Sequence, residues 1–169
     1  MVAFRDRVDA YFRSADTPLS PEAVATFTGL AYYPLDRSWR LETVPDRRGA
    51  GTPVEILDNQ GNRRDYRVHS RLRFRHGADA FTLTVYEAPG EEDLFLPFRD
   101  PTNGTETYGA GRYVGVELLP EGMVRVDFNL AKNPYCAYAD RWACPLVPEK
   151  NVLTIPVTAG EKAFAGGGR

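Results

Sequence analysis

The stretch from residue 99 to residue 113 concentrates side chains that can bind a negatively charged ligand. Arg99 and Arg112 stand near its ends, and a guanidinium group grips a carboxylate or a phosphate through paired hydrogen bonds. Gly104, Gly109 and Gly111 lie between them, and glycine lets backbone amides approach a ligand closely. The stretch therefore predicts the rim of an anion-binding pocket. Its candidate ligand-binding residues are Arg99, Asp100, Glu106, Tyr108, Arg112 and Tyr113.

A second interpretation of the same stretch is purely structural. Glycine and small polar residues are typical of tight β-turns, so the stretch also fits a glycine-rich hairpin. In that hairpin Arg99 pairs with Asp100, and Glu106 pairs with Arg112. The glycine spacing is not a phosphate-binding fingerprint, because it lacks the Gly-Lys-Ser/Thr ending and does not open a helix. Both interpretations stay open at the level of the sequence.

Polar residues further along the chain extend the candidate site. In residues 124–130 apolar and polar side chains alternate, which places Asp127 and Asn129 opposite the apolar face. There they can line a cavity beside the following loop, in which Asn133 and Tyr135 complete the candidate ligand-binding set. The alternatives are an exposed strand face, or a buried pair between Asp127 and Arg112, which is costly unless it is well hydrogen-bonded.

The cysteines and histidines do not form a metal-binding pattern. Cys136 and Cys144 are eight residues apart, whereas zinc sites usually pair cysteines two to four residues apart. Only His69 and His76 could complete such a site, and they belong to another strand and its turn. We therefore predict no metal and two buried structural thiols, with a disulfide only if the protein is exported.

Apolar periodicity predicts helices first and strands afterwards. Residues 2–13 carry one apolar stripe at helical spacing, and Ser20-Pro21-Glu22 is a typical helix start, with Gly29 as its end. After residue 32 the period becomes two, and the clearest hairpin joins residues 66–75 to 81–85 through a turn at 76–79. Further strands are expected at 39–44, 54–57, 94–98, 112–118, 124–130 and 153–157, whereas residues 131–151 fit neither period.

These elements predict a mainly β fold. We expect a small antiparallel β-barrel, or a sandwich, with one or two N-terminal helices across one end. A single domain is expected over residues 1–162, with the helices in 2–28 and the barrel in 32–160. Residues 163–169, which include three consecutive glycines, are expected to be a flexible tail.

Composition excludes several function classes. The chain has 169 residues and a formal net charge of −2, which disfavours nucleic-acid binding because that needs a basic surface. No apolar run is long enough to span a bilayer, and the charged N-terminus does not resemble a secretory signal. We therefore expect a cytoplasmic protein that binds neither nucleic acid nor membrane, and its oligomeric state is left open.

Longer motifs point to a known family. They are residues 94–113 (LFLPFRDPTNGTETYGAGRY), residues 127–138 (DFNLAKNPYCAY) and the close of the chain, from Trp142-Ala143-Cys144-Pro145 to Ala159-Gly160-Glu161-Lys162. With similar residues around 19–34, they resemble a family of bacterial and archaeal proteins known as domain-of-unknown-function family 1684. One departure is Lys132, where the family pattern has an aromatic residue. The resemblance implies no activity, but it directs the search for chemistry to residues 94–144.

The function predicted from these observations is binding of a small polar or anionic ligand in a β-barrel pocket, and no cofactor is identified. One alternative is an enzyme: either a hydrolase that uses Glu106 or Asp127 with Tyr108, or a flavin-dependent protein. Another alternative is a protein-interaction module that uses the charged face of the strand at 66–75. The arginines of that face are Arg67, Arg71, Arg73 and Arg75.

Overall fold

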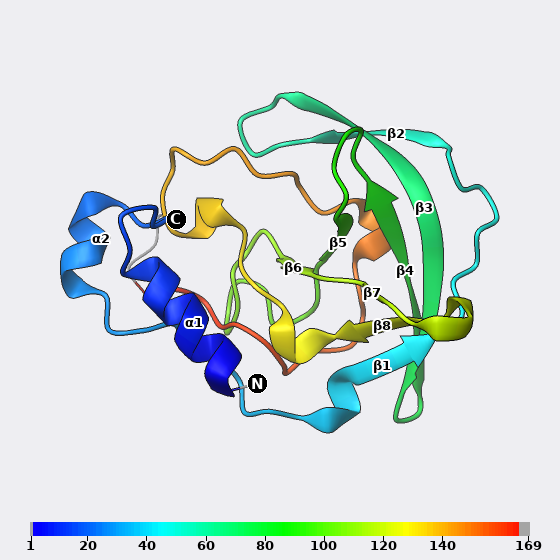
Figure 1. Ribbon diagram of the computed structural model, residues 1–169, viewed down its shortest axis with the longest axis horizontal. Coiled ribbons are helices and arrows are strands. Elements are labelled where there is room, and N and C mark those ends of the chain that lie inside the picture. The colour runs from blue at the N-terminus through cyan, green and yellow to red at the C-terminus, as the bar shows by residue number, and fades with distance from the viewer. Residues whose placement is uncertain (1, 166–169) are drawn as a thin grey trace.

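Two helices open the chain in the computed structural model, which describes residues 2–165 (Figure 1). They are α1 (Val2–Phe12) and α2 (Pro21–Thr26). Ser20 caps α2 as predicted, because its side chain accepts a hydrogen bond from the amide of Ala23 at 3.2 Å. Both helices pack on one end of the molecule, where Phe12, Leu19, Ala23 and Tyr138 form a small apolar cluster.

The strands form two antiparallel sheets. The larger sheet has the order β2 (Pro53–Leu57), β3 (Arg63–His76), β4 (Asp79–Glu87), β5 (Leu94–Phe98), β6 (Arg112–Val114). The smaller sheet has the order β1 (Arg40–Thr43), β8 (Val124–Asp127), β7 (Glu117–Leu118). Short 3₁₀ turns cover Arg37–Trp39, Pro120–Gly122, Phe128–Leu130, Tyr135–Ala137 and Glu149–Asn151. The main core lies between the sheets and includes Trp39, Leu72, Phe98, Val126 and Phe128.

The longest hairpin agrees with the sequence pattern. His76 pairs with Asp79 across a tight turn in which Gly77 adopts a φ of 59°, a conformation that suits glycine. On β3 the predicted inner face is buried from Tyr66 to Phe74, while the arginines of the other face are exposed. The alternation survives a bulge between Val68 and Ser70. The period-two pattern therefore identified both the strand and its buried side.

The mainly β prediction is confirmed, but the sheets described in residues 2–165 do not close into a barrel, and a sandwich-like arrangement is consistent with them. The expected strand at 153–157 does not form. Side chains, not a neighbouring strand, bond to its backbone. The amide of Val157 donates to Asp100 Oδ2 at 2.7 Å, and the carbonyl of Val157 accepts from Arg112 Nη2 at 2.8 Å. Because these groups are occupied, no sheet ladder can use them.

Two further expected strands are shorter than predicted. The strand expected at 112–118 is divided into β6 and β7, and the strand expected at 124–130 ends at Asp127. There the Asp127 carboxylate accepts from the amide of Asn129 at 3.0 Å and turns the chain into the 3₁₀ segment Phe128–Leu130. A capping carboxylate competes with a sheet ladder, and here it ends the strand.

The irregular segment 131–151 is held by a few specific hydrogen bonds. The buried side chain of Asn151 bonds to the amide and carbonyl of Thr84 and to the carbonyl of Pro97, all within 2.8 Å. In the part of the expected tail that is described, Phe164 packs against Phe27 and Tyr138. Residues 166–169 lie outside the described residues. No helix within 2–165 has the length and apolar character needed to cross a membrane.

Candidate functional site

Arg112, the first residue of β6, lies in the interior with no exposed side-chain surface. Its Nη2 is 3.3 Å from Asp100 Oδ1, and its terminal nitrogens donate to the carbonyls of Val157, Ala159 and Glu161 at 2.6–3.2 Å. Burial lowers the pKa of Arg112, and the Asp100 carboxylate opposes that effect. The guanidinium group thus binds protein atoms and ties the C-terminal segment to the core.

The polar stretch after Asp100 folds on itself. The Asp100 carboxylate accepts from the amide and hydroxyl of Thr102, whose hydroxyl lies 2.8 Å from that of Thr107. Asn103 donates to Thr107 and to the carbonyl of Tyr108. This geometry follows the structural interpretation of the stretch, in which its polar residues brace one another.

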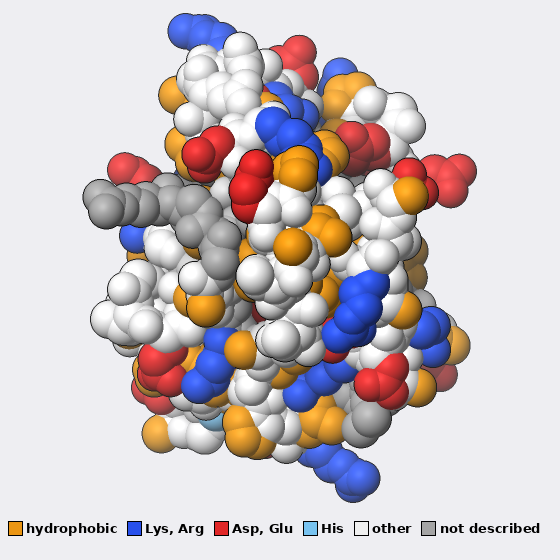
Figure 2. All heavy atoms as spheres, turned by 90° about the vertical axis from the view of Figure 1, so that its left-hand side faces the viewer, with side chains coloured by type: hydrophobic (Ala, Val, Ile, Leu, Met, Phe, Trp, Pro, Cys, Tyr) orange, Lys and Arg blue, Asp and Glu red, His pale blue; other side chains and the backbone are white. Residues whose placement is uncertain are grey.

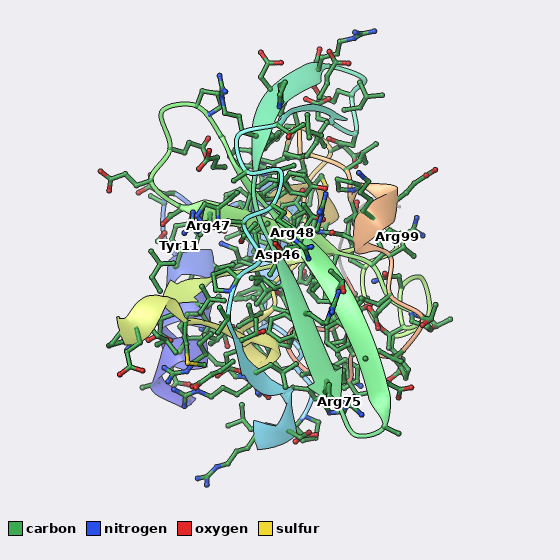
Figure 3. The ribbon with its side chains drawn as sticks, turned by 90° about the vertical axis from the view of Figure 1, so that its right-hand side faces the viewer. Tyr11, Asp46, Arg47, Arg48, Arg75 and Arg99 are labelled. Atoms are coloured by element: carbon green, nitrogen blue, oxygen red, sulfur yellow. The ribbon has the colours of Figure 1, made fainter. Side chains whose placement is uncertain are left out.

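The ion pairs of this stretch differ from those expected. Asp100 pairs with Arg112, not with Arg99, and Glu106 lies 3.7 Å from Lys162. Glu106 therefore pairs with a lysine from the end of the chain, which a local hairpin model could not anticipate. Arg99 is exposed, and Figure 3 shows it on a side of the molecule away from Arg47 and Arg48.

Asp127 and Asn129 bind each other. The Asp127 carboxylate accepts from the Asn129 side chain at 2.8 Å, and Asn129 bonds to the backbone amide and carbonyl of Asp36. The buried pair suggested between Asp127 and Arg112 is not formed, because Asp100 occupies that position. Asp127 and Asn129 instead brace the segment that precedes β1.

Tyr108 and Tyr113 face the irregular segment. The Tyr108 hydroxyl donates to Cys136 Sγ at 3.6 Å, and the Tyr113 hydroxyl donates to the carbonyl of Pro145. Burial raises the pKa of both phenols, so they act as neutral hydrogen-bond donors near neutral pH. The hydrolase alternative needs Glu106 or Asp127 beside Tyr108, yet these three side chains bond to different partners.

A cavity of about 220 Å³ lies between α1 and residues 130–138. Its aromatic walls are Phe4, Tyr11, Phe12, Tyr32, Tyr135 and Tyr138, and its polar lining is Lys132, Asn133 and Glu161. Of the candidate residues named from the sequence, Asn133 and Tyr135 line this cavity. The Tyr11 and Tyr135 hydroxyls are 3.3 Å apart and connect the helix to the opposite wall. Figure 2 views this side of the molecule, where apolar and charged side chains mix at the surface.

Glu161 is the charged residue that the cavity buries. Its side chain accepts from the amide and side chain of Asn133, both at 3.0 Å, and from the Tyr138 hydroxyl. Burial raises its pKa to about 7, although these hydrogen bonds and Arg112 act in the opposite direction. A carboxyl group that titrates near neutral pH inside a cavity is a candidate for ligand binding or proton transfer.

Gly160 allows the backbone to place Glu161 at the cavity. It has a φ of 80°, and a Cβ there would lie 2.7 Å from the carbonyl oxygens of Phe128 and Ala131. Without a side chain, the backbone can pass close enough for the Glu161 amide to donate to Ala131 at 2.9 Å. Sequence reasoning missed Glu161 because no local pattern marks it. The only signal was its place in the closing motif of the family resemblance.

Asn133 has one acceptor that the protein leaves unused. Its side-chain nitrogen donates to Glu161 and to the carbonyl of Lys162 at 2.9 Å, which fixes the orientation of the amide. Its Oδ1 is buried and has no partner among the described atoms. Next to it in sequence, Lys132 is exposed, and none of the ion pairs within residues 2–165 includes it. Both residues therefore retain hydrogen-bonding capacity at the cavity.

The cysteines are free and buried, and no group of three or more His, Cys, Asp or Glu side chains in the described chain could hold a metal. The arginines of β3 remain on the surface, and Figure 3 shows Arg75 near the end of the β3–β4 hairpin, apart from Arg47 and Arg48. An open groove of about 380 Å³ lies beside Arg48, Arg71 and Arg73.

A solved structure shares this fold. The solution NMR structure of an uncharacterised protein from Haloarcula marismortui is similar with a TM-score of 0.74 and 35% sequence identity. The match covers 95% of this chain and 91% of that one. The chain matches no curated protein.

Residues 25–162 match the family described as "Protein of unknown function (DUF1684)". The chain belongs to this family, as its motifs predicted. The matched region contains the buried Arg112, the irregular segment 131–151 and Glu161, whereas α1 lies outside it. The family assignment carries no activity, so function must be argued from the cavity.

Proposed function

We propose that this protein binds a small carboxylic acid with an apolar body in the cavity under α1. The observation that carries the proposal is the composition of that cavity, in which aromatic walls surround a buried Glu161 and an unpaired Lys132. Small-molecule sites typically combine apolar walls with a few polar groups that orient the ligand. The anionic ligand expected from the sequence is retained, but its site moves from Arg99 and Arg112 to this cavity.

Each polar residue has a distinct part in the proposed complex. The Lys132 ammonium binds the ligand carboxylate, and the aromatic rings contact its apolar body. Glu161 favours an anionic ligand while it is protonated, because a neutral carboxyl does not repel a carboxylate and can donate a hydrogen bond. Ligand binding therefore raises the pKa of Glu161 further, and affinity falls as the pH rises through about 7.

The test is calorimetric titration with benzoate and hexanoate, compared with benzamide and hexanamide. We expect the carboxylates to bind at least about tenfold more tightly than the amides, because the amides lack the charge that Lys132 pairs with. Lys132→Met removes this preference, whereas the control Lys150→Met, which changes an exposed lysine of the turn Glu149–Asn151, retains it.

Three results would contradict the proposal. One is that wild type binds none of the four compounds, and another is that acids and amides bind equally. The third is an affinity that rises with pH, which would indicate a cationic ligand attracted by ionised Glu161. A yellow purified protein would instead support the flavin-dependent alternative.

A further inference from the structure

Two thiols meet in the irregular segment. The backbone amide of Cys136 donates to Cys144 Sγ at 3.2 Å, which places the two cysteines side by side. Both cysteines are buried and free. Cys144 follows Cys136 by eight positions, and the chain between them reverses through a turn in which the Trp142 amide donates to the carbonyl of Ala139. The fold thus brings two oxidisable thiols close together.

The surroundings of the two sulfurs differ. Cys136 Sγ accepts from the Tyr108 hydroxyl at 3.6 Å. The pKa of Cys136 is lowered to about 7, chiefly by the hydrogen bond from Cys144 and also by Tyr108, against the effect of burial. The pKa of Cys144 is raised, because its neighbour holds the negative charge. The contact from the Tyr108 hydroxyl to Cys136 Sγ favours Cys136 as the thiol that ionises and reacts first.

The backbone around the pair is held unequally. Asn59 binds Cys144 on both sides, since its side chain accepts from the Cys144 amide at 2.7 Å and its own amide donates to the Cys144 carbonyl at 3.0 Å. Cys136 lies in the short 3₁₀ turn Tyr135–Ala137. Asn59 thus fixes the backbone of Cys144 to the turn between β2 and β3. Cys136, in contrast, lies on a single short turn that few backbone hydrogen bonds constrain.

An open hollow lies beside two residues that adjoin Cys136. It has a volume of about 490 Å³ and is lined by Tyr108, whose hydroxyl contacts Cys136, and by Ala137, the next residue in the chain.

We propose that Cys136 and Cys144 are a redox-active pair that hydrogen peroxide oxidises to an intrachain disulfide. The Cys136 thiolate attacks one peroxide oxygen, the O–O bond breaks, and hydroxide leaves and is protonated to water. The Cys136 sulfenic acid that results is attacked by Cys144 sulfur. The S–S bond forms, the S–O bond breaks, and the hydroxyl group leaves as water with the Cys144 proton. Two thiols are oxidised and one peroxide is reduced to two waters.

Mass spectrometry of the native wild-type protein tests this directly. After peroxide treatment, the protein is unfolded, alkylated with N-ethylmaleimide and digested with trypsin. Trypsin cleaves after Lys132, Arg141 and Lys150, so the cysteines fall in separate peptides, 133–141 and 142–150. We expect these two peptides to be joined within one chain and to separate after dithiothreitol. Sulfinic acid on Cys136 beside an alkylated Cys144, full alkylation of both thiols, or dimers linked between chains would each overturn the proposal.

Variants then separate the roles of the two sulfurs. In Cys144→Ala, oxidation stops at the sulfenic acid of Cys136, which dimedone labels, whereas Cys136→Ala leaves Cys144 alkylatable under the same conditions. Tyr108→Phe removes a donor to the thiolate, and we expect oxidation at pH 7 to slow by about fivefold. Equal dimedone labelling of both single-cysteine variants would show that the pair lacks the proposed asymmetry and would count against it.

Discussion

Arg112 and Asp100 form an ion pair whose side chains are both fully buried, with 3.3 Å between Nη2 and Oδ1. A buried ion pair is expensive to desolvate and remains favourable only when additional hydrogen bonds satisfy both groups. Here the carbonyls of Val157, Ala159 and Glu161 supply those bonds to the terminal nitrogens of Arg112, whose Nε has no partner among the described atoms, and Thr102 supplies them to Asp100. The pair therefore acts as a structural connection between β6 and residues 157–161.

Removing one partner of this pair should be strongly destabilising. We expect Arg112→Met to lower the free energy of unfolding by about 3–5 kcal/mol, because it leaves the Asp100 charge buried without a counter-charge. Urea denaturation measures the loss. The control is Arg48→Met, since the Arg48–Asp46 pair is on the surface and its loss should have a much smaller effect. Equal losses in both variants would show that Arg112 is not the connection described here.

Glu161 should make the stability of the protein depend on pH. Its pKa is about 7 in the folded state against an ordinary value of 4.5, so the native state binds more protons than the unfolded state between these values. The free energy of unfolding therefore falls by roughly 3 kcal/mol as the pH rises from about 4.5 to about 7, and above that range Glu161 causes no further change. In Glu161→Gln the contribution disappears. The measurement is the difference in unfolding free energy between wild type and variant across that range. A difference that does not change with pH would contradict the prediction.

Tyr138 should hold down the pKa of Glu161. Its hydroxyl donates to Glu161 Oε1, and a hydrogen bond to the ionised form stabilises that form. We expect Tyr138→Phe to raise the pKa of Glu161. The fall in unfolding free energy caused by Glu161 then extends to higher pH. Carboxyl ¹³C NMR titration of glutamate-labelled protein measures the shift. The same titration on Tyr135→Phe, which changes the neighbouring cavity wall, should show a smaller change.

Gly160 should tolerate no side chain. We expect Gly160→Ala to cost about 3 kcal/mol or more, because its positive φ is strained for alanine and the new Cβ meets the carbonyl oxygens of Phe128 and Ala131. The matched control is Gly90→Ala, where φ is similar but no atom lies within 4 Å of the added Cβ. Thermal unfolding should show only the backbone cost there, about 1 kcal/mol. Similar losses of stability in both variants would show that close backbone packing is not the reason why position 160 needs glycine.

Local chemistry made much of the fold predictable. Ser20 marks the start of α2 because a hydroxyl can cap free amides, and the alternation from Tyr66 to Phe74 marks both β3 and its buried face. These features depend on residues close in sequence. Period-two patterns do not show which strands pair at long range, and for that reason the closed barrel could not be distinguished from two separate sheets.

The candidate site was less predictable for the same reason. Residues 153–157 read as a strand, but the partners of Val157 are side chains more than forty residues away in sequence, Asp100 and Arg112. Glu161 has no local motif, and its raised pKa results from burial that only the folded chain creates. Of the residues named from the sequence, Asn133 and Tyr135 line the cavity, and long irregular segments often carry residues with such a role.

The bonds of Arg112 also have a consequence for synthesis of the protein. Its three carbonyl partners lie in residues 157–161, which the ribosome produces long after β6. A nascent chain that stops short of them carries a guanidinium group that cannot be buried without partners. Completion of the core around Arg112 therefore waits for the synthesis of residues 157–161.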